Sequence, residues 1–137
     1  MIAVDLHVHT CHSPDSNTPL RAIVRGCERA GIDCVAITDH DCIEGALELQ
    51  SSGAMRVIVG EEIRTAAGEL LGLFLSERVP PGLSPLETIA RVKAQGGLVC
   101  MPHPFSRWPV ARGSALGDGS GSNFAPTASL LRMNGLL

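Results

Sequence analysis

The sequence predicts an α/β fold whose strands are mainly parallel and form a sheet or a barrel. Two observations lead to this prediction. Short apolar runs of strand length alternate with helix-length segments over the first hundred residues. Histidines and a glutamate follow directly on several of these runs, at positions 7, 9, 40, 62 and 103. The two observations support each other, because parallel α/β folds gather their chemistry at the carboxyl ends of the strands.

Strands are expected where apolar and β-branched residues form short uninterrupted runs. The clearest run covers residues 34–38, and its continuous apolar character is typical of a parallel strand that is buried on both faces. The expected strands cover residues 2–6, 34–38, 56–59, 70–75 and 98–101.

Helices are expected where capping residues precede a segment of helical length. The predicted helices cover residues 19–30, about 42–51 and about 85–95, and glycines at 31 and 96 supply two of the stops. Their predicted starts are Thr18 followed by Pro19, a capping box of Asp41 with Glu44, and a capping box of Ser84 with Glu87. Residues 128–133 are expected to form at most one or two helical turns.

Composition sets the class of protein and excludes others. The chain has 137 residues, 45% of them hydrophobic and 18% charged, which suits one globular domain with a buried core. A net charge of −3 without a basic run argues against a broad nucleic-acid-binding face, although a pocket for a nucleotide stays open. No apolar run approaches the roughly 20 residues that span a membrane. Asp5 and His7 interrupt any signal-peptide pattern, and five cysteines without regular spacing favour reduced thiols, so a cytoplasmic location is expected.

The chain divides in composition near residue 111. Residues 1–111 carry the alternating pattern and form the expected domain, whereas residues 112–137 begin with a Gly- and Ser-rich stretch typical of a linker. The second part is therefore expected to be a linker-like or divergent tail.

Candidate metal ligands stand at the ends of the predicted strands. His7 and His9 lie two residues apart, so a strand places both imidazoles on one face, and Asp15 follows in the adjoining loop. His40 follows the buried strand, and Asp39 or Asp41 is expected either to orient it through its second nitrogen or to cap the next helix.

Two further strand ends add to this set. Glu61 and Glu62 face opposite sides by alternation, so only one of them can point into the site. His103 stands between two prolines, which hold it in a rigid extended loop. Mixed imidazole and carboxylate donors suit Zn, Mn or Fe, and several ligands from different strands predict a site with two or three divalent ions.

Four segments resemble, in order and spacing, the motifs of the PHP (polymerase and histidinol phosphatase) family of metal-dependent phosphoesterases, over about residues 1–108. They are Asp5–Thr10, Ala36–Asp41, Gly60–Ile63 and Pro102–Pro104. The resemblance implies a distorted β/α barrel with the metal site at the carboxyl ends of its strands.

The resemblance also implies roles for single residues. His7 and His9 correspond to the pair on one metal, Asp15 and His40 to ligands of a second, Glu62 to a bridging carboxylate and His103 to a ligand of the third. Arg107 suits contact with a substrate phosphate. Glu69 stands where many members of the family have another ligating histidine, so it is either a further ligand or a solvated carboxylate of a hairpin.

The function that the resemblance implies is hydrolysis of phosphoesters in small metabolites, nucleotides or short nucleic acids by a metal-activated hydroxide. The family's late Gly-Ser-Asp-x-His segment is not found, so the chain is expected to be a C-terminally truncated, partial barrel. Two alternatives follow: a non-catalytic metal-binding remnant, or a histidinol-phosphate phosphatase. An open sheet edge at residues 98–101 also predicts self-association, and no membrane partner is expected.

Overall fold

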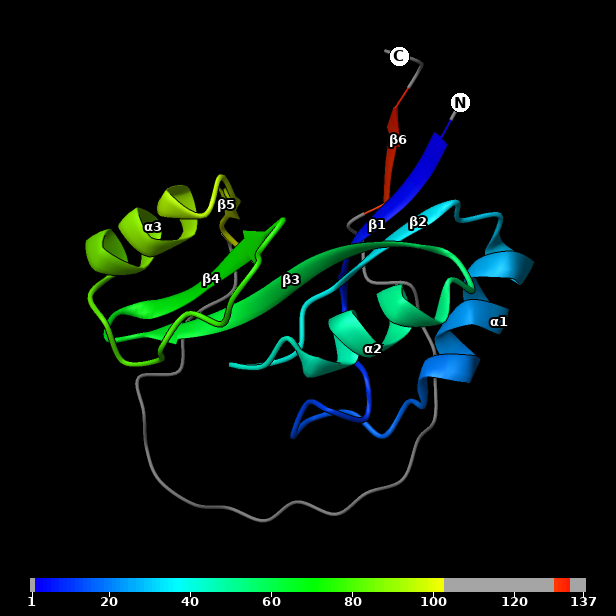
Figure 1. Cartoon of the computed structure of the whole chain (residues 1–137), viewed down its shortest axis with the longest axis horizontal. Helices are drawn as coiled ribbons and strands as arrows, with labels where there is room; N and C mark the ends of the chain where they lie inside the picture. The colour runs from blue at the N-terminus through cyan, green and yellow to red at the C-terminus, as the bar shows by residue number, and fades with distance from the viewer. Residues whose placement is uncertain (1, 103–129, 134–137) are drawn as a thin grey trace.

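The computed structural model describes residues 2–102 and 130–133, which form one mixed sheet with three helices (Figure 1). The domain boundary predicted at residue 111 lies outside the described residues. In chain order the elements are β1 (Ile2–Val8), α1 (Leu20–Ala30), β2 (Cys34–Ile37), α2 (Glu44–Ser52), β3 (Arg56–Thr65), β4 (Gly68–Leu73), α3 (Pro85–Ala94), β5 (Leu98–Cys100) and β6 (Leu130–Met133).

The strands form a six-stranded sheet in the order β5-β4-β3-β2-β1-β6. The predicted α/β fold is confirmed, and the predicted parallel pairing holds for β1 with β2 and for β2 with β3. The other three pairs, β3 with β4, β4 with β5 and β1 with β6, are antiparallel. The arrangement is that of a partial barrel with an open sheet among the described residues.

The helical turns predicted for residues 128–133 are wrong where the structure describes them. Residues 130–133 form β6, which pairs with β1 from Ile2 to Asp5. A segment this short has no means of nucleating a stable helix by itself, whereas an adjacent strand edge satisfies its backbone groups.

β3 is long enough to pair with two different strands. The change of partner determines where the candidate ligand Glu62 lies. Its first part, residues 56–59, pairs with β2, and its second part, residues 60–65, pairs with β4. At the transition a Cβ on Gly60 would lie 2.9 Å from the Gly72 carbonyl oxygen and 2.9 Å from Thr38 Cγ2, so only glycine allows the close approach. β3 therefore runs on past the carboxyl end of β2, and Glu62 forms a parallel bridge with His40 there.

The helix starts show which caps the sequence predicted correctly. At α3 the Ser84–Glu87 capping box is confirmed, with both reciprocal hydrogen bonds present. At α1 the predicted Thr18 cap is wrong, because Pro19 is itself extended at ψ 149° and the helix begins one residue later. At α2 the Asp41 cap is also wrong: the N-cap residue is Ile43, without a side-chain cap.

The core lies between the sheet and the helices. α2 packs against β2 and β3, and α3 packs against β3, β4 and β5 (Figure 1). The fully buried apolar residues of this core are Ile23, Val35, Ile37, Ala46, Ile63, Val79 and Val92. Among the helices that the structure describes, none has the length and apolar character that crossing a membrane requires.

Candidate metal centre

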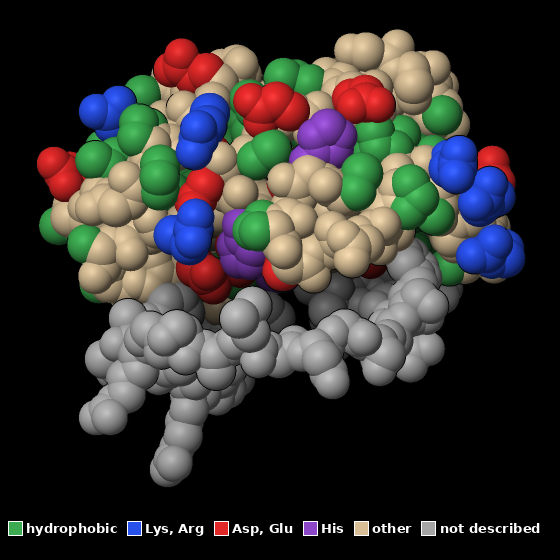
Figure 2. Space-filling view, turned by 90° about the horizontal axis from the view of Figure 1, so that it is seen from below, with side chains coloured by type: hydrophobic (Ala, Val, Ile, Leu, Met, Phe, Trp, Pro, Cys, Tyr) green, Lys and Arg blue, Asp and Glu red, His purple; other side chains and the backbone are tan. Residues whose placement is uncertain are grey.

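The predicted ligands within the described residues gather where β1 and β2 end and β3 continues. Histidine and acidic side chains lie close together on this face of the molecule (Figure 2). Five of the six predicted ligands contribute: His7 and His9 from β1 and its end, Asp15 from the following loop, His40 from the end of β2, and Glu62 from the middle of β3. The sixth, His103, and the predicted phosphate contact Arg107 lie outside the described residues.

Three donor atoms converge on one point. Oε2 of Glu62 lies 2.9 Å from Nε2 of His7 and 2.9 Å from Nε2 of His9, and the two imidazole nitrogens lie 3.0 Å apart. Glu62 is 2% exposed and His7 is 6% exposed, so water has little access to this point. Two ring nitrogens that both face one buried carboxylate oxygen make a donor set that fits a divalent ion of the Zn, Mn or Fe class.

A second group of donors lies beside the first and shares His9. Nδ1 of His9 lies 3.0 Å from Oδ1 of Asp15, and Nε2 of His40 lies 3.4 Å from Oδ2 of Asp15. The same His40 nitrogen is 3.7 Å from Oε2 of Glu62. A third group combines His40 and Glu62 with Glu69 of β4, and within each group the donor atoms lie within 4.8 Å of one another. The three groups overlap, with His9 in the first and second and Glu62 in the first and third, so the arrangement offers donors for more than one ion.

The charges of these groups depend on one another. Burial raises the pKa of Glu62, but the hydrogen bonds from His7 and His9 outweigh burial and lower it to about 2. Burial lowers the pKa of His9, but Glu62 and Asp15 outweigh burial and raise it to about 9. Burial likewise raises the pKa of Asp15, yet the hydrogen bonds from Ser13 and His9 leave it below its ordinary value. The centre is thus an array of anionic carboxylates around imidazoles, and a divalent cation can take the place of the His9 proton.

Buried hydrogen bonds join the loop after β1 to the end of β2. Asp39 accepts from the backbone N–H of Thr10 at 2.6 Å and from the Thr10 hydroxyl at 2.8 Å, and both residues are fully buried. The hydroxyl of Ser13 donates to Asp15 at 2.5 Å and accepts from the backbone N–H of His40 at 3.2 Å. Sequence analysis assigned no role to Thr10 or Ser13, because the type of these two residues does not reveal a hydrogen-bond partner in a distant segment of the chain.

Neither aspartate beside His40 orients its ring. The carboxylate of Asp39 is taken up by Thr10, and that of Asp41 accepts from the backbone N–H of Arg64 at 2.9 Å and pairs with the Arg64 guanidinium. The prediction that Asp39 or Asp41 orients His40 or caps the next helix is therefore wrong. Both carboxylates instead tie β2 to neighbouring segments of chain.

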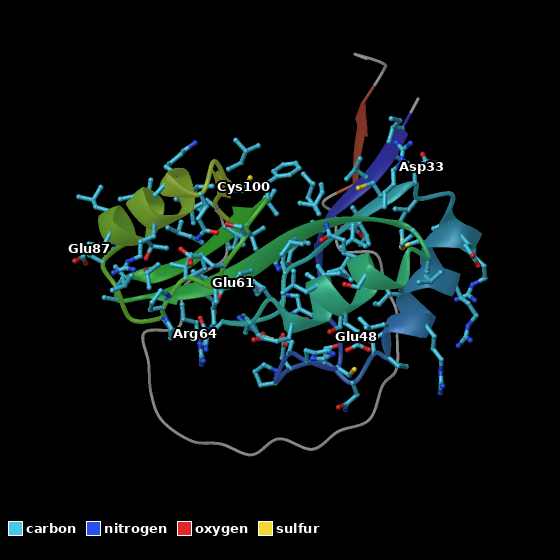
Figure 3. The ribbon with its side chains drawn as sticks, viewed as in Figure 1. Asp33, Glu48, Glu61, Arg64, Glu87 and Cys100 are labelled. Carbon is cyan, nitrogen blue, oxygen red and sulfur yellow. The ribbon has the colours of Figure 1, made fainter. Side chains whose placement is uncertain are left out.

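The adjacent residues Glu61 and Glu62 point to opposite faces of β3, as predicted from the alternation of side chains along a strand. Glu62 faces the histidines, whereas Glu61 is fully buried on the other face of β3 and accepts from the backbone N–H of Val79 at 2.9 Å (Figure 3). Nε of Arg78 lies 3.8 Å from its second oxygen. Burial raises the pKa of Glu61 to about 7, against the smaller opposing effects of Val79 and Arg78. Glu61 therefore supports the chain after β4 and takes no part in the donor groups.

Two known proteins are similar to this chain in sequence. The chain is 45% identical over 127 residues to the uncharacterized protein MJ1587 of Methanocaldococcus jannaschii, covering 83% of this chain and 72% of the relative. It is 39% identical over 102 residues to MJ0417 of the same organism, covering 74% of this chain and 39% of the relative.

A solved structure shares the fold. It is a two-domain protein from Bacteroides vulgatus ATCC 8482 containing a predicted PHP-like metal-dependent phosphoesterase, with a TM-score of 0.63 and 20% identity, and the match covers 79% of this chain. The chain spans only 39% of the length of that protein. The family model of the PHP domain matches residues 5–95, which hold all five ligand candidates described above. The chain belongs to the PHP domain family.

Proposed function

We propose that this protein is a metal-dependent phosphoesterase that hydrolyses phosphoester bonds in small metabolites, nucleotides or short nucleic acids. The observation that carries the proposal is the convergence of His7 and His9 on the buried carboxylate of Glu62, with Asp15 and His40 beside them. Membership of the PHP domain family supports it, and the similar Bacteroides protein is named for a predicted PHP-like metal-dependent phosphoesterase.

Each residue has a distinct part in this proposal. His7, His9 and Glu62 would hold one ion, and Asp15 and His40 would hold a second beside it. Divalent ions held in this way supply Lewis acidity, which activates water and offsets charge on phosphoryl oxygens. The ionised Glu62, with its pKa of about 2, stays an anionic ligand across the physiological range.

Two predicted contributors complete the proposal beyond the described residues. His103 is proposed as a ligand of a third ion, and Arg107 as a contact for the substrate phosphate. The five cysteines are unpaired, which supports a reducing, cytoplasmic setting for the activity.

The first test measures metal content and affinity. Protein stripped with a chelator and reloaded with Zn, Mn or Fe is expected to bind at least two ions, measured by elemental analysis and calorimetry. His40→Ala should weaken binding while circular dichroism stays unchanged. His12→Ala is the matched control, because the His12 ring pairs with Glu48 at the surface and belongs to none of the donor groups. Wild-type protein that binds none of these metals would contradict the proposal.

The second test measures hydrolysis by the loaded protein. A panel of p-nitrophenyl phosphate, bis-p-nitrophenyl phosphate and histidinol phosphate separates a monoesterase, a diesterase and a histidinol-phosphate phosphatase. Turnover of any of these that His40→Ala abolishes and His12→Ala preserves supports the proposal. Metal binding without turnover on the panel would favour the alternative of a non-catalytic metal-binding protein.

A further inference from the structure

We infer that Glu69 is the positioning residue for His40: its carboxylate accepts a hydrogen bond from Nδ1–H and thereby leaves Nε2 free to face Asp15 and Glu62. The inference rests on the proposed metal centre and adds to it a residue that lies outside the ligand set proposed above. The two nitrogens of the His40 ring meet different surroundings.

Nε2 of His40 faces the metal centre. It lies 3.4 Å from Asp15 and 3.7 Å from Glu62, the carboxylates of the two neighbouring donor groups. A neutral imidazole has one lone pair, so a ring that ligates through Nε2 carries its proton on Nδ1. The Nδ1–H group then needs an acceptor, because a buried donor without one costs about 1–3 kcal/mol.

Nδ1 is buried and has no hydrogen-bond partner among the described residues. The nearest carboxylate oxygen with which it forms an ion pair is Oε1 of Glu69, at 3.7 Å. This distance is longer than a hydrogen bond, but the Glu69 side chain is 28% exposed and has the freedom to close it by rotation. Hydrogen bonds of this kind are commonly long before a site is loaded.

The carboxylates of the two aspartates on either side of His40 already accept hydrogen bonds from other residues. Asp39 accepts two hydrogen bonds from Thr10, and Asp41 accepts two from Arg64. Each is held by its partner in another segment of chain. Within the part of the chain that the structure describes, Glu69 is thus the carboxylate left for the ring's second nitrogen.

The register of β4 on β3 explains why the Glu69 carboxylate lies near His40. Glu69 pairs directly with Arg64 of β3, and direct partners in an antiparallel pair point to the same face. Arg64 is two residues from Glu62, so it shares the face on which the metal centre lies. Figure 3 shows the Arg64 side chain projecting from β3. Glu69 consequently stands beside the centre, at the edge formed by β4.

The competing role for Glu69 is that of a direct ligand. Donor atoms of His40, Glu62 and Glu69 do lie within 4.8 Å of one another. However, the Glu69 oxygen approaches the ring at Nδ1, on the side opposite the nitrogen that faces Asp15 and Glu62. A histidine that binds a metal commonly donates its other N–H to a carboxylate. That carboxylate sets the tautomer of the imidazole and raises its basicity as a ligand.

The test compares Glu69→Ala and Glu69→Gln with the wild type, using zinc as the probe. Glu48→Gln is the matched control, because Glu48 is an exposed glutamate that pairs with His12. Calorimetry and elemental analysis give the affinity and the number of ions, and long-range ¹H–¹⁵N spectra of the zinc-loaded protein report the His40 tautomer.

We expect Glu69→Ala to weaken zinc binding by about 10- to 100-fold with the number of ions at saturation unchanged. Glu69→Gln should recover part of this loss, because an amide oxygen also accepts from Nδ1–H. Zinc-loaded wild type should show His40 protonated at Nδ1, and the melting temperatures of the metal-free variants should match the wild type.

Three results would overturn the inference. One fewer ion in Glu69→Ala at saturating zinc would make Glu69 a ligand. Unchanged affinity in both variants, while the wild type binds zinc, would show that Glu69 has no part in the centre and would leave the proposed function standing. Wild type that binds no zinc, manganese or iron would overturn the proposed function together with this inference.

Discussion

At the scale of single residues, Glu61 and Glu62 have the same chemistry and opposite surroundings. Glu62 faces two imidazoles, which lower its pKa to about 2, whereas burial raises the pKa of Glu61 to about 7. The strand's alternation alone separates them. A matched pair of substitutions therefore isolates the contribution of each face of β3.

Glu62→Gln should weaken metal binding by more than about 100-fold, because it removes a charged ligand, whereas Glu61→Gln should leave the affinity unchanged. Glu61 should instead affect stability. A raised pKa means that the folded state holds the proton more tightly, so stability falls as the pH rises from 4.5 to about 7. Glu61→Gln should remove this decline and be more stable than the wild type at pH 8 by about 3 kcal/mol, measured by urea unfolding. Equal loss of metal in both variants would contradict the assignment of faces.

His9 links metal binding to pH. Its pKa of about 9 means that the metal-free protein carries a proton on His9 at pH 7. A ligating imidazole must be neutral, so each ion bound at His9 at pH 7 should release about one proton, and affinity should rise by about tenfold per pH unit up to pH 9. In the metal-free protein, His9 contributes stability that is full below pH 6.5 and is lost as the pH rises through 9.

Calorimetry in two buffers of different ionisation enthalpy counts the protons released. A heat of binding that is the same in both buffers at pH 7 would show that no proton leaves, and would contradict this account of His9.

At the scale of elements, one buried contact holds the ends of β1 and β2 together. Asp39 precedes His40 and binds Thr10, which follows His9, so one carboxylate joins two ligand-bearing segments. α2 closes over this contact at Gly45, where a Cβ would lie 2.5 Å from Oδ2 of Asp39 and 2.8 Å from the Thr10 hydroxyl. The start of α2 thus packs directly on the framework of the site.

Gly45→Ala tests this packing. An ordinary Gly→Ala change in a helix stabilises by about 0.5–1 kcal/mol, but here we expect the opposite sign, a loss of about 1–3 kcal/mol from overlap with buried atoms. Metal affinity should fall as well, because the overlap displaces the segments that carry His9 and His40. Ser51→Ala, an exposed position of the same helix, is the control and should change neither quantity. A stabilised Gly45→Ala protein with unchanged affinity would show that the contact does not constrain the site.

At the scale of the whole molecule, the sheet formed by the described residues is open at β5. β5 pairs with β4 on one side, and no strand of the described residues covers its other side. Leu98 on this strand is 50% exposed. Unpaired backbone groups beside an exposed apolar side chain are a template for pairing with a second strand.

We therefore expect concentration-dependent self-association, measured by sedimentation velocity. Leu98→Lys should shift the equilibrium toward the monomer, because a charged edge residue opposes pairing. Leu86→Lys is the control, since Leu86 is 79% exposed but lies at the start of α3 and not on a strand. A wild type that stays monomeric at every concentration would contradict the prediction.

The sequence by itself determined the positions of the strands and the kinds of side chain at their ends. His7 and His9 share a face because side chains alternate along a strand, and His40 follows a continuous apolar run of strand length. Alternation also required Glu61 and Glu62 to separate. These are local consequences of backbone geometry, and residues close together in the chain suffice to predict them.

Only the tertiary structure decided which carboxylates meet which partners. Glu62 reaches the histidines because β3 runs past the end of β2 and changes its partner at Gly60. Asp39 turns to Thr10, 29 residues away, and Glu69 comes to His40 through the register of β4 on β3. Such contacts depend on strand order and register, which arise from the packing of the whole sheet. The same short motif is compatible with several such arrangements until the core selects one.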